Sequence, residues 1–187
     1  IAGPSRGGTI VELEYSGKID EVIYCAFGRH YATGVIISTT RIDWKSPASS
    51  AGVVNVELSI PGIYSTSSGI TYTYNEDISV LLVTPTAVPL GGGTEITITG
   101  LNFLPTITFK ITEYGEPTAI STYVSSNEIK FIAPKSSTIG SKAIYLSNND
   151  EDYYQRYDYP LYYYNGIIAT AVFPEKIIIG SKTEITI

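Results

Sequence analysis

An internal repeat constrains the fold of this chain more than any other feature. The pentapeptide TEITI occupies residues 94–98 and recurs unchanged at residues 183–187, a displacement of 89 residues. Pro85 is displaced by the same 89 residues to Pro174, and a fainter repeat that begins at Pro4 precedes the second one by 85 residues. A period of about 85–90 residues predicts that one small unit is copied along the chain. The 187 residues have room for two such units and the beginning of a third.

The composition favours strands separated by turns within each repeat. The chain has 16 Tyr, 17 Gly and 10 Pro, and it is rich in Ile, Val and Thr. β-Branched and aromatic residues are enriched in strands, whereas Gly and Pro are enriched in turns. Residues 94–99 alternate as a strand does, so we expect Ile96 and Ile98 to face a core while Thr97 and Thr99 face water. The sequence therefore predicts an all-β fold.

Segments of this kind predict seven strands in the second repeat and six in the first. Seven short strands with turn residues between them suggest a β-sandwich. We therefore expect two tandem β-sandwiches and the opening strands of a third repeat. The expected strands are residues 78–84, 94–99, 106–112, 118–123, 128–133, 142–147 and 159–165 in the second repeat, and 8–15, 21–27, 34–39, 40–45, 52–59 and 69–74 in the first.

The two ends of the chain are complementary to each other. The first repeat starts at a position equivalent to about Thr86, so it lacks a counterpart of the strand at 78–84. We accordingly expect a first repeat at residues 1–77, a second at 78–166, and a segment at 167–187 that holds the opening strands of a third. The last segment would supply the strand that the first repeat lacks.

This segment, which we call the tail, suggests how molecules assemble. We expect it to add a strand to the exposed edge of the first repeat in a neighbouring molecule. Such a head-to-tail contact would give an open homo-oligomer rather than a closed ring. The alternative is a continuous longer polypeptide with both ends trimmed. The candidate assembly residues in the tail are Ile168, Val172, Phe173, Ile177 and Ile179.

A family resemblance rests on residues 89–103, which read PLGGGTEITITGLNF, followed by residues 129–134, Gly140, residues 147–149 and a Tyr-rich last strand. This pattern resembles the IPT/TIG domain, and it covers the second repeat well and the first moderately. The resemblance implies an immunoglobulin-like sandwich of the E-set type, here in tandem within a large surface protein. Family members serve in receptors, transcription factors, starch-active enzymes and surface arrays, and fold alone does not choose among these roles.

Charge and side-chain chemistry exclude several function classes. With 12 Lys and Arg against 18 Asp and Glu, the chain lacks the basic surface that binds phosphates, which argues against a nucleic-acid partner. The chain has one histidine, His30, and one cysteine, Cys25. We expect a core thiol and a surface imidazole in a turn rather than a catalytic pair, so we predict no enzyme activity, catalytic residue, metal or cofactor. The apolar runs are far shorter than the ~20 residues of a membrane-spanning helix, so this segment should not insert into a membrane.

Two neighbouring features near residue 150 are candidate binding surfaces. The run of residues 148–152, NNDED, is expected to be a solvent-facing hairpin tip, with a weak Ca²⁺ site as the alternative. The tyrosines that follow crowd one segment, and strand alternation must turn some of them outward. Outward tyrosines stack on glycans or favour protein interfaces, although they also fill sheet surfaces between strands. The candidate interface or ligand residues are Tyr153, Tyr154, Tyr157 and Tyr162.

Two functions follow from these observations. The first is a structural repeat module of an extracellular filament or cell-surface appendage, which assembles end to end through immunoglobulin-like domains by strand addition. The alternative is a ligand- or glycan-binding module of an adhesin or receptor ectodomain. In both cases the expected location is extracellular or at the cell surface.

Overall fold

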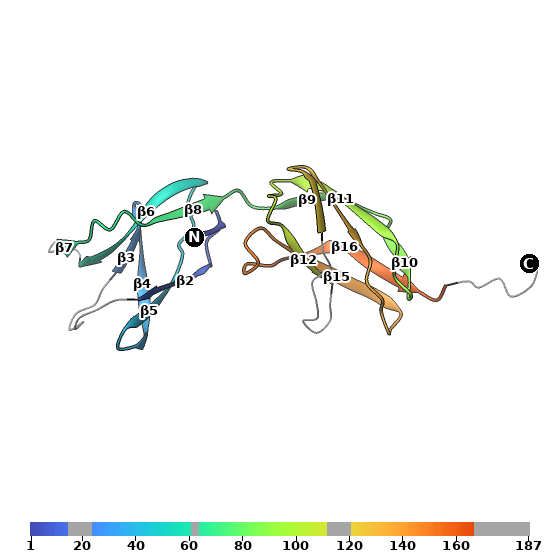
Figure 1. The fold of residues 1–187 in the computed structure, drawn as a ribbon, viewed down its shortest axis with the longest axis horizontal. Coiled ribbons are helices and arrows are strands. Elements are labelled where there is room, and N and C mark those ends of the chain that lie inside the picture. The colour runs from blue at the N-terminus through green and yellow to red at the C-terminus, as the bar shows by residue number, and fades with distance from the viewer. Residues whose placement is uncertain (15–23, 61–63, 112–120, 167–187) are drawn as a thin grey trace, which may run out of the picture.

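The computed structural model describes residues 1–14, 24–60, 64–111 and 121–166, and these residues form two β-sandwich units (Figure 1). Strands β1 to β8 build an N-terminal unit, and strands β9 to β16 build a C-terminal unit. Both units are immunoglobulin-like, so the predicted all-β fold class is confirmed. Because no comparison tests the boundaries that the repeats suggest, the division at residues 77 and 166 stays a prediction.

The N-terminal unit is a sandwich whose two layers share one long strand. Its strands follow the order β1-β8-β6-β3-β4-β5-β2, and β7 pairs with β6. Strand β4 pairs with β3 along its first half and with β5 along its second half, so it passes from one layer to the other. The strands are β1 (Ala2–Pro4), β2 (Ile10–Glu14), β3 (Tyr24–Phe27), β4 (His30–Ser38), β5 (Arg41–Lys45), β6 (Gly52–Ile60), β7 (Tyr64–Ser65) and β8 (Thr71–Asn75).

The C-terminal unit has two separate four-stranded sheets. One has the order β10-β16-β15-β12, and the other has the order β13-β14-β11-β9. The strands are β9 (Ser79–Thr84), β10 (Ala87–Pro89), β11 (Glu95–Leu101), β12 (Thr108–Ile111), β13 (Ser121–Ser125), β14 (Glu128–Ile132), β15 (Gly140–Ser147) and β16 (Tyr154–Tyr164).

The core of the C-terminal unit follows the alternation seen in the sequence. Ile96, Ile98 and Ile129 are fully buried, and Phe131 is 2% exposed. The Phe131 ring lies 4.0 Å from the ring of Phe109, centroid to centroid. The inward alternation predicted for this strand pair is therefore confirmed, and burial of these apolar side chains is the main favourable contribution to folding.

The two units share several local contacts at equivalent positions. Strand β1 pairs with β8 in parallel, as β10 pairs with β16. The Tyr74 hydroxyl donates to the carbonyl of Pro47 at 2.9 Å, and the Tyr163 hydroxyl donates to the carbonyl of Pro134 at 3.0 Å. A glycine with positive φ lies against the same connection in each unit, Gly7 in one and Gly92 in the other. The sequence repeat is therefore accompanied by a repeat of backbone and side-chain geometry.

Two sequence expectations were wrong in detail. His30 does not lie in a turn but is the first residue of β4, opposite Phe27, with an exposed side chain. The short strands β1, β7 and β10 were not predicted, and β1 and β10 each end in a proline, which normally argues against a strand. Proline is tolerated here because both strands lie at a sheet edge, where one side of the backbone needs no partner.

The triple glycine before β11 allows a matched stability test. An added Cβ at Gly92 would lie 2.5 Å from the Ala133 carbonyl oxygen at φ +69°, whereas one at Gly93 meets no atom within 4 Å at φ +82°. Gly91 has neither constraint. We expect Gly91→Ala to be nearly neutral, Gly93→Ala to cost about 1 kcal/mol of unfolding free energy for backbone strain, and Gly92→Ala to cost about 2 kcal/mol. Urea unfolding measures the free energy of unfolding of the three variants. Equal losses in Gly92→Ala and Gly93→Ala would contradict a steric role for the Ala133 carbonyl.

Candidate functional site

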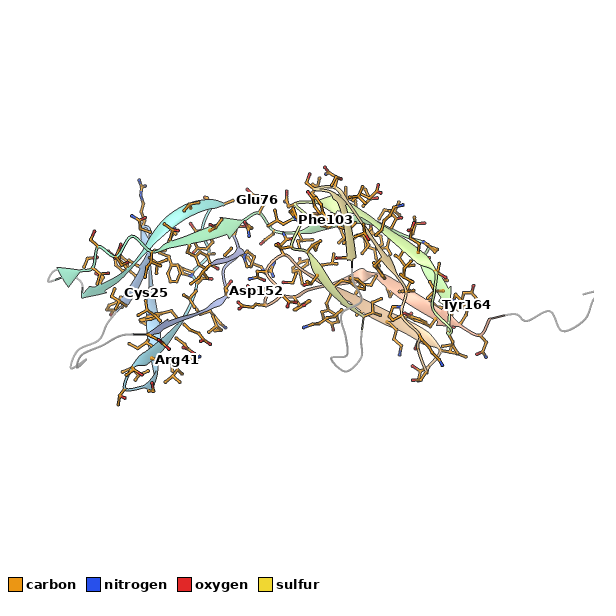
Figure 2. All side chains as sticks on the ribbon, in the orientation of Figure 1. Cys25, Arg41, Glu76, Phe103, Asp152 and Tyr164 are labelled. Carbon is orange, nitrogen blue, oxygen red and sulfur yellow. The ribbon has the colours of Figure 1, made fainter. Side chains whose placement is uncertain are left out.

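The main candidate site is the junction at which the two units meet (Figure 2). The loop between β15 and β16 contacts the N-terminal unit: the Asn149 side-chain amide donates to the Ala2 carbonyl at 3.1 Å, and the Thr9 hydroxyl donates to Asp152 at 2.6 Å. Asn149 and Asp152 are half-buried, so the expectation of a solvent-facing hairpin tip is wrong for both residues. It holds for Asp150 and Glu151, which are exposed.

A chain of hydrogen bonds runs from the core of the N-terminal unit into this loop. The buried Tyr72 hydroxyl donates to Thr9 Oγ1 at 2.8 Å, and Thr9 Oγ1 in turn donates to Asp152 Oδ2. The same carboxylate oxygen accepts a bond from Asn149 Nδ2 at 2.7 Å. Hydrogen bonds to charged groups in partly desolvated surroundings are stronger than neutral ones. Asp152 therefore holds the two units together through a specific polar contact.

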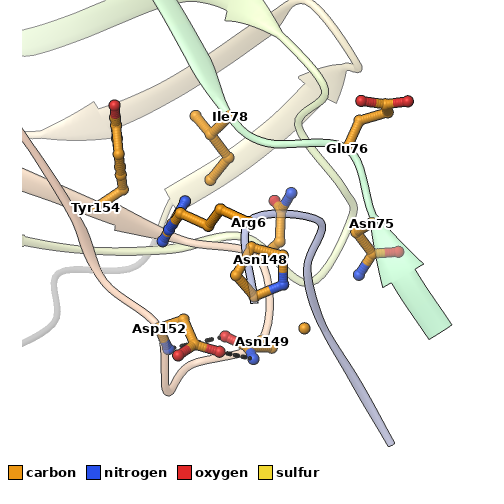
Figure 3. Close-up of a pocket in the computed structure, with 10 residues that line it drawn as sticks. Arg6, Asn75, Glu76, Ile78, Asn148, Asn149, Asp152 and Tyr154 are labelled. Carbon is orange, nitrogen blue, oxygen red and sulfur yellow. Dashed lines mark hydrogen bonds between the residues drawn. The ribbon is translucent and has the colours of Figure 1, made fainter. Parts of the chain in front are cut away.

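Arg6 supplies the positive charge of the junction (Figure 3). Its guanidinium group lies 3.4 Å from the Asp77 carboxylate and 4.7 Å from the centre of the Tyr154 ring. About a third of the side chain is exposed, so solvent weakens the ion pair, while the cation–π contact adds to it. Arg6 thus links the loop after β1 to the start of β16.

The cavity beside Arg6 is too small for an organic ligand. Its volume is about 20 Å³, which is room for a water molecule, whereas ligand pockets usually exceed about 300 Å³. Residues of both units line it, among them Asn75, Ile78 and Asn149. The cavity therefore belongs to the packing of the junction.

The acidic loop does not have the arrangement of a calcium site. Asp152 Oδ2 accepts two side-chain bonds, and Asn149 Oδ1 accepts the backbone N–H of Asp152 at 2.9 Å. These oxygens already serve protein donors, and the Arg6 cation lies nearby. Among the described residues, no group of three or more His, Cys, Asp or Glu side chains is placed to hold a metal ion.

The three candidate tyrosines whose side chains the structure describes, Tyr153, Tyr154 and Tyr162, do not form one surface. Tyr153 donates to Asp150, and this bond, together with one from Thr108, lowers the pKa of the Asp150 carboxyl. The Lys110 ammonium lies 3.6 Å from the Tyr153 ring centre. Tyr154 lies under Arg6, Tyr162 is 45% exposed on β16, and the side chain of Tyr157 is outside the described residues. The proposed ligand role of these residues stays a prediction.

A second candidate site is the outer edge of β2. In the C-terminal unit the equivalent strand, β11, pairs with β14 on one side and with β9 on the other. Strand β2 pairs with β5 and ends its sheet, so among the described residues no strand covers its other side. Leu13 on β2 is partly exposed, whereas its counterpart Ile98 is fully buried. The tail residues expected to act in assembly lie outside the part that the structure describes.

The thiol and the imidazole do not make a reactive pair. Cys25 is fully buried in the core of the N-terminal unit, and burial, helped by the charge of Glu57, raises its pKa to about 12. Its thiolate fraction at neutral pH is therefore negligible, and a protonated thiol is a poor nucleophile. No described segment is a helix of the length and apolarity needed to cross a bilayer.

Sequence reasoning did not identify Arg6, Thr9 or Tyr72 as junction residues. A signal was present for one of them: the repeat aligns Arg6 with Gly91, so a long charged side chain replaces a glycine at an otherwise similar turn. Thr9 and Tyr72 carry no such signal, because both residue types are common in strands throughout the chain.

Comparison with known proteins agrees with the fold. Residues 79–164 match the family model described as the IPT/TIG domain. A search of curated protein sequences finds no match. Among solved structures, the full extracellular region of plexin A4, domains 1 to 10, has a TM-score of 0.55 at 16% identity over 91% of this chain. This chain spans 16% of that plexin chain, and at such identity the likeness concerns the fold alone.

Other solved structures resemble the chain less well. A second structure of the plexin A4 extracellular region, with domains 1 to 8, has a TM-score of 0.46 at 17% identity and covers 87% of this chain and 17% of its own. SGBP-B from a complex xyloglucan utilization locus in Bacteroides uniformis has a TM-score of 0.38 at 14% identity, over 86% of this chain and 46% of its own. The family match and the observed sandwich together identify residues 79–164 as an IPT/TIG domain of the immunoglobulin-like class.

Proposed function

We propose that the chain is a non-catalytic structural module of an extracellular filament or cell-surface appendage, in which molecules join end to end through their immunoglobulin-like units. The observation that carries this proposal is the junction. Side chains of both units, Thr9 and Arg6 on one side and Asp152 and Tyr154 on the other, hold the units end to end. A spacer or filament needs such fixed contacts, because a free linker would let the units swing independently.

The shared geometry of the two units supports a tandem arrangement of IPT/TIG domains. The parallel edge strand, the tyrosine-to-proline hydrogen bond and the positive-φ glycine all recur in the N-terminal unit. Plexin A4, whose extracellular region shares the fold, supports placing this module outside the cell. The net charge of −6 and the buried thiol favour a role without nucleic acid or catalysis.

Electron microscopy of the purified full chain tests this function. If molecules join end to end, negatively stained samples should contain threads with a regular axial period that spans two units. A concentration series that shows only discrete two-unit particles would contradict the proposal. Intact-mass measurement of the same sample shows whether a thread consists of separate chains or of one longer polypeptide.

A ligand-binding module is the second candidate, favoured by the outer face of β16. Tyr162 is 45% exposed and Tyr164 is 39% exposed, and both point away from the core, whereas the alternating residues Leu161 and Tyr163 are buried. Exposed aromatic rings on one face can stack on sugars or bind a protein partner. If this is the function, Tyr162→Ala should abolish binding on a glycan array with little change in thermal stability. Unchanged binding would exclude this face.

A further inference from the structure

We infer that residues 168–173 of one molecule add as an antiparallel strand to the open edge of β2 in the next molecule. This inference rests on the proposed end-to-end joining and names the segments that make it. The C-terminal unit supplies the template, because β9 pairs there with β11, the counterpart of β2. Strand β2 ends its sheet and no described strand pairs with its second side, and such an edge is where an added strand binds.

The repeat fixes the register of the added strand. In the C-terminal unit Ile98 lies opposite Val83. The repeat counterpart of Ile98 is Leu13, which lies 85 residues earlier in the chain. The repeat counterpart of Val83 is Val172, which lies 89 residues later. The pairs Thr97 with Thr84, Ile98 with Val83, and Thr99 with Leu82 therefore become Glu12 with Phe173, Leu13 with Val172, and Glu14 with Ala171.

The spacing along the chain requires that the acceptor be another molecule. Strand β8 ends at Asn75 and β9 begins at Ser79, so three residues carry the chain from one unit to the next. Strand β16 ends at Tyr164, and three residues likewise separate it from Ile168. Three linking residues span at most about 14 Å. The chain's own β2 lies beyond the whole C-terminal unit (Figure 1), so the strand must pair with the unit that follows.

The inward faces of donor and acceptor are chemically matched. Val80 and Val83 of β9 are 4% and 2% exposed, because they cover the β11 side of the core. Their tail counterparts are Ala169 and Val172, which are also apolar. Leu13 is left partly exposed where Ile98 is covered, so the acceptor retains apolar surface at the place that Val172 would cover.

The template fixes the register of the added strand only as far as Glu14. In the C-terminal unit the ladder shifts register between Thr99 and Gly100, and an added Cβ at Gly100 would lie 2.2 Å from the carbonyl oxygen of Ser79. The first repeat has Tyr15 at the equivalent position. The added strand therefore cannot copy this bulge, and we confine the register to residues 12–14.

Cysteine cross-linking in the full chain tests the register. Glu14→Cys with Ala171→Cys places two outward side chains opposite each other, within reach of a disulfide. Oxidation should give a ladder of dimers, trimers and higher species on non-reducing gels. The matched control is Glu12→Cys with Ala171→Cys, because Glu12 would lie opposite Phe173, two residues along the strand from Ala171, which is too far for a disulfide. The buried Cys25 should stay unreactive in both variants.

The yields decide between the outcomes. We expect at least tenfold more cross-linked product from the 14/171 pair than from the 12/171 pair. An equimolar mixture of the single variants Glu14→Cys and Ala171→Cys should give dimers and nothing larger. Equal yields from the two pairs, a disulfide within one chain, or no product would each overturn the strand inference. Threads in a sample that gives no cross-links would mean that molecules do form a filament but are joined at another surface. Cross-linked multimers in a sample that forms no threads would support the added strand and contradict the filament function.

Discussion

Replacing Val172 by aspartate should abolish the end-to-end joining of molecules and leave the fold of each molecule intact. The counterpart of Val172 in the C-terminal unit, Val83, is 2% exposed and covers the core beside Ile98. The variant would lose about 1.5 kcal/mol or more from valine burial and would place an unpaired carboxylate in an apolar site at a further cost of several kcal/mol. The concentration needed for assembly should therefore rise by more than about 100-fold, as measured by sedimentation velocity over a dilution series.

A matched substitution two residues earlier in the tail serves as the control. Thr170 is the counterpart of Leu81, which is 54% exposed on the outer face of β9. Thr170→Asp adds the same charge to the same tail but keeps it in solvent, so we expect a change of less than about threefold in the assembly concentration. If the two variants assemble equally well, or if both fail, the tail does not bind through the face that the repeat predicts.

Most of the fold could be predicted from the sequence because apolar and polar residues alternate along the strands that form the core. Ile96, Ile98, Ile129 and Phe131 alternate with polar neighbours, and all four are buried as expected. The resemblance to the IPT/TIG domain rests on the same stretch, which the family match covers. Alternation and turn residues report on the immediate neighbours of a residue, and that is sufficient to place strands.

Features that depend on distant partners could not be predicted in this way. Strand β4 passes between layers because its two halves pair with β3 and β5, and no local pattern records such a change of partner. The sequence of residues 148–152 predicts a polar hairpin tip in solvent. In the structure, however, Asp152 contacts Thr9, which lies 143 residues earlier in the chain. A carboxylate that binds water and one that binds a neighbouring unit have the same signature in sequence.

The internal junction could not be copied at the contact that we propose between molecules. Arg6 aligns with Gly91, so the exposed end of the C-terminal unit has no side chain where the internal junction has a guanidinium. Thr9 aligns with Thr94, so this hydroxyl is present in both repeats. The loop between β15 and β16, which contacts the N-terminal unit, begins at Asn148, and the first repeat has Ile60 at the equivalent position. A joint between molecules would therefore need another source of affinity, and an added strand provides backbone hydrogen bonds that do not depend on these side chains.

Within one molecule, replacing Asp152 by alanine should destabilise the other unit. Asp152 lies in the C-terminal unit, yet it is the acceptor for the buried Thr9 hydroxyl, which in turn accepts from Tyr72 in the core of the N-terminal unit. Without the carboxylate, a buried hydroxyl loses its partner and the junction loses two charge-assisted bonds, at a total cost of about 3 kcal/mol. The chain's one tryptophan, Trp44, is buried in the N-terminal unit, so its fluorescence reports unfolding of that unit alone.

The expected result is a fall of roughly 1–2 M in the urea midpoint of the Trp44 transition. Glu151→Ala removes a charge from the same loop, but Glu151 is exposed and should leave the midpoint unchanged within about 0.3 M. A double-mutant cycle with Thr9→Val should show coupling of about 1–2 kcal/mol, since both substitutions remove the same hydrogen bond. An unshifted Trp44 transition in Asp152→Ala, or additive effects in the cycle, would mean that the two units touch without stabilising each other, and the junction could not then stiffen a filament.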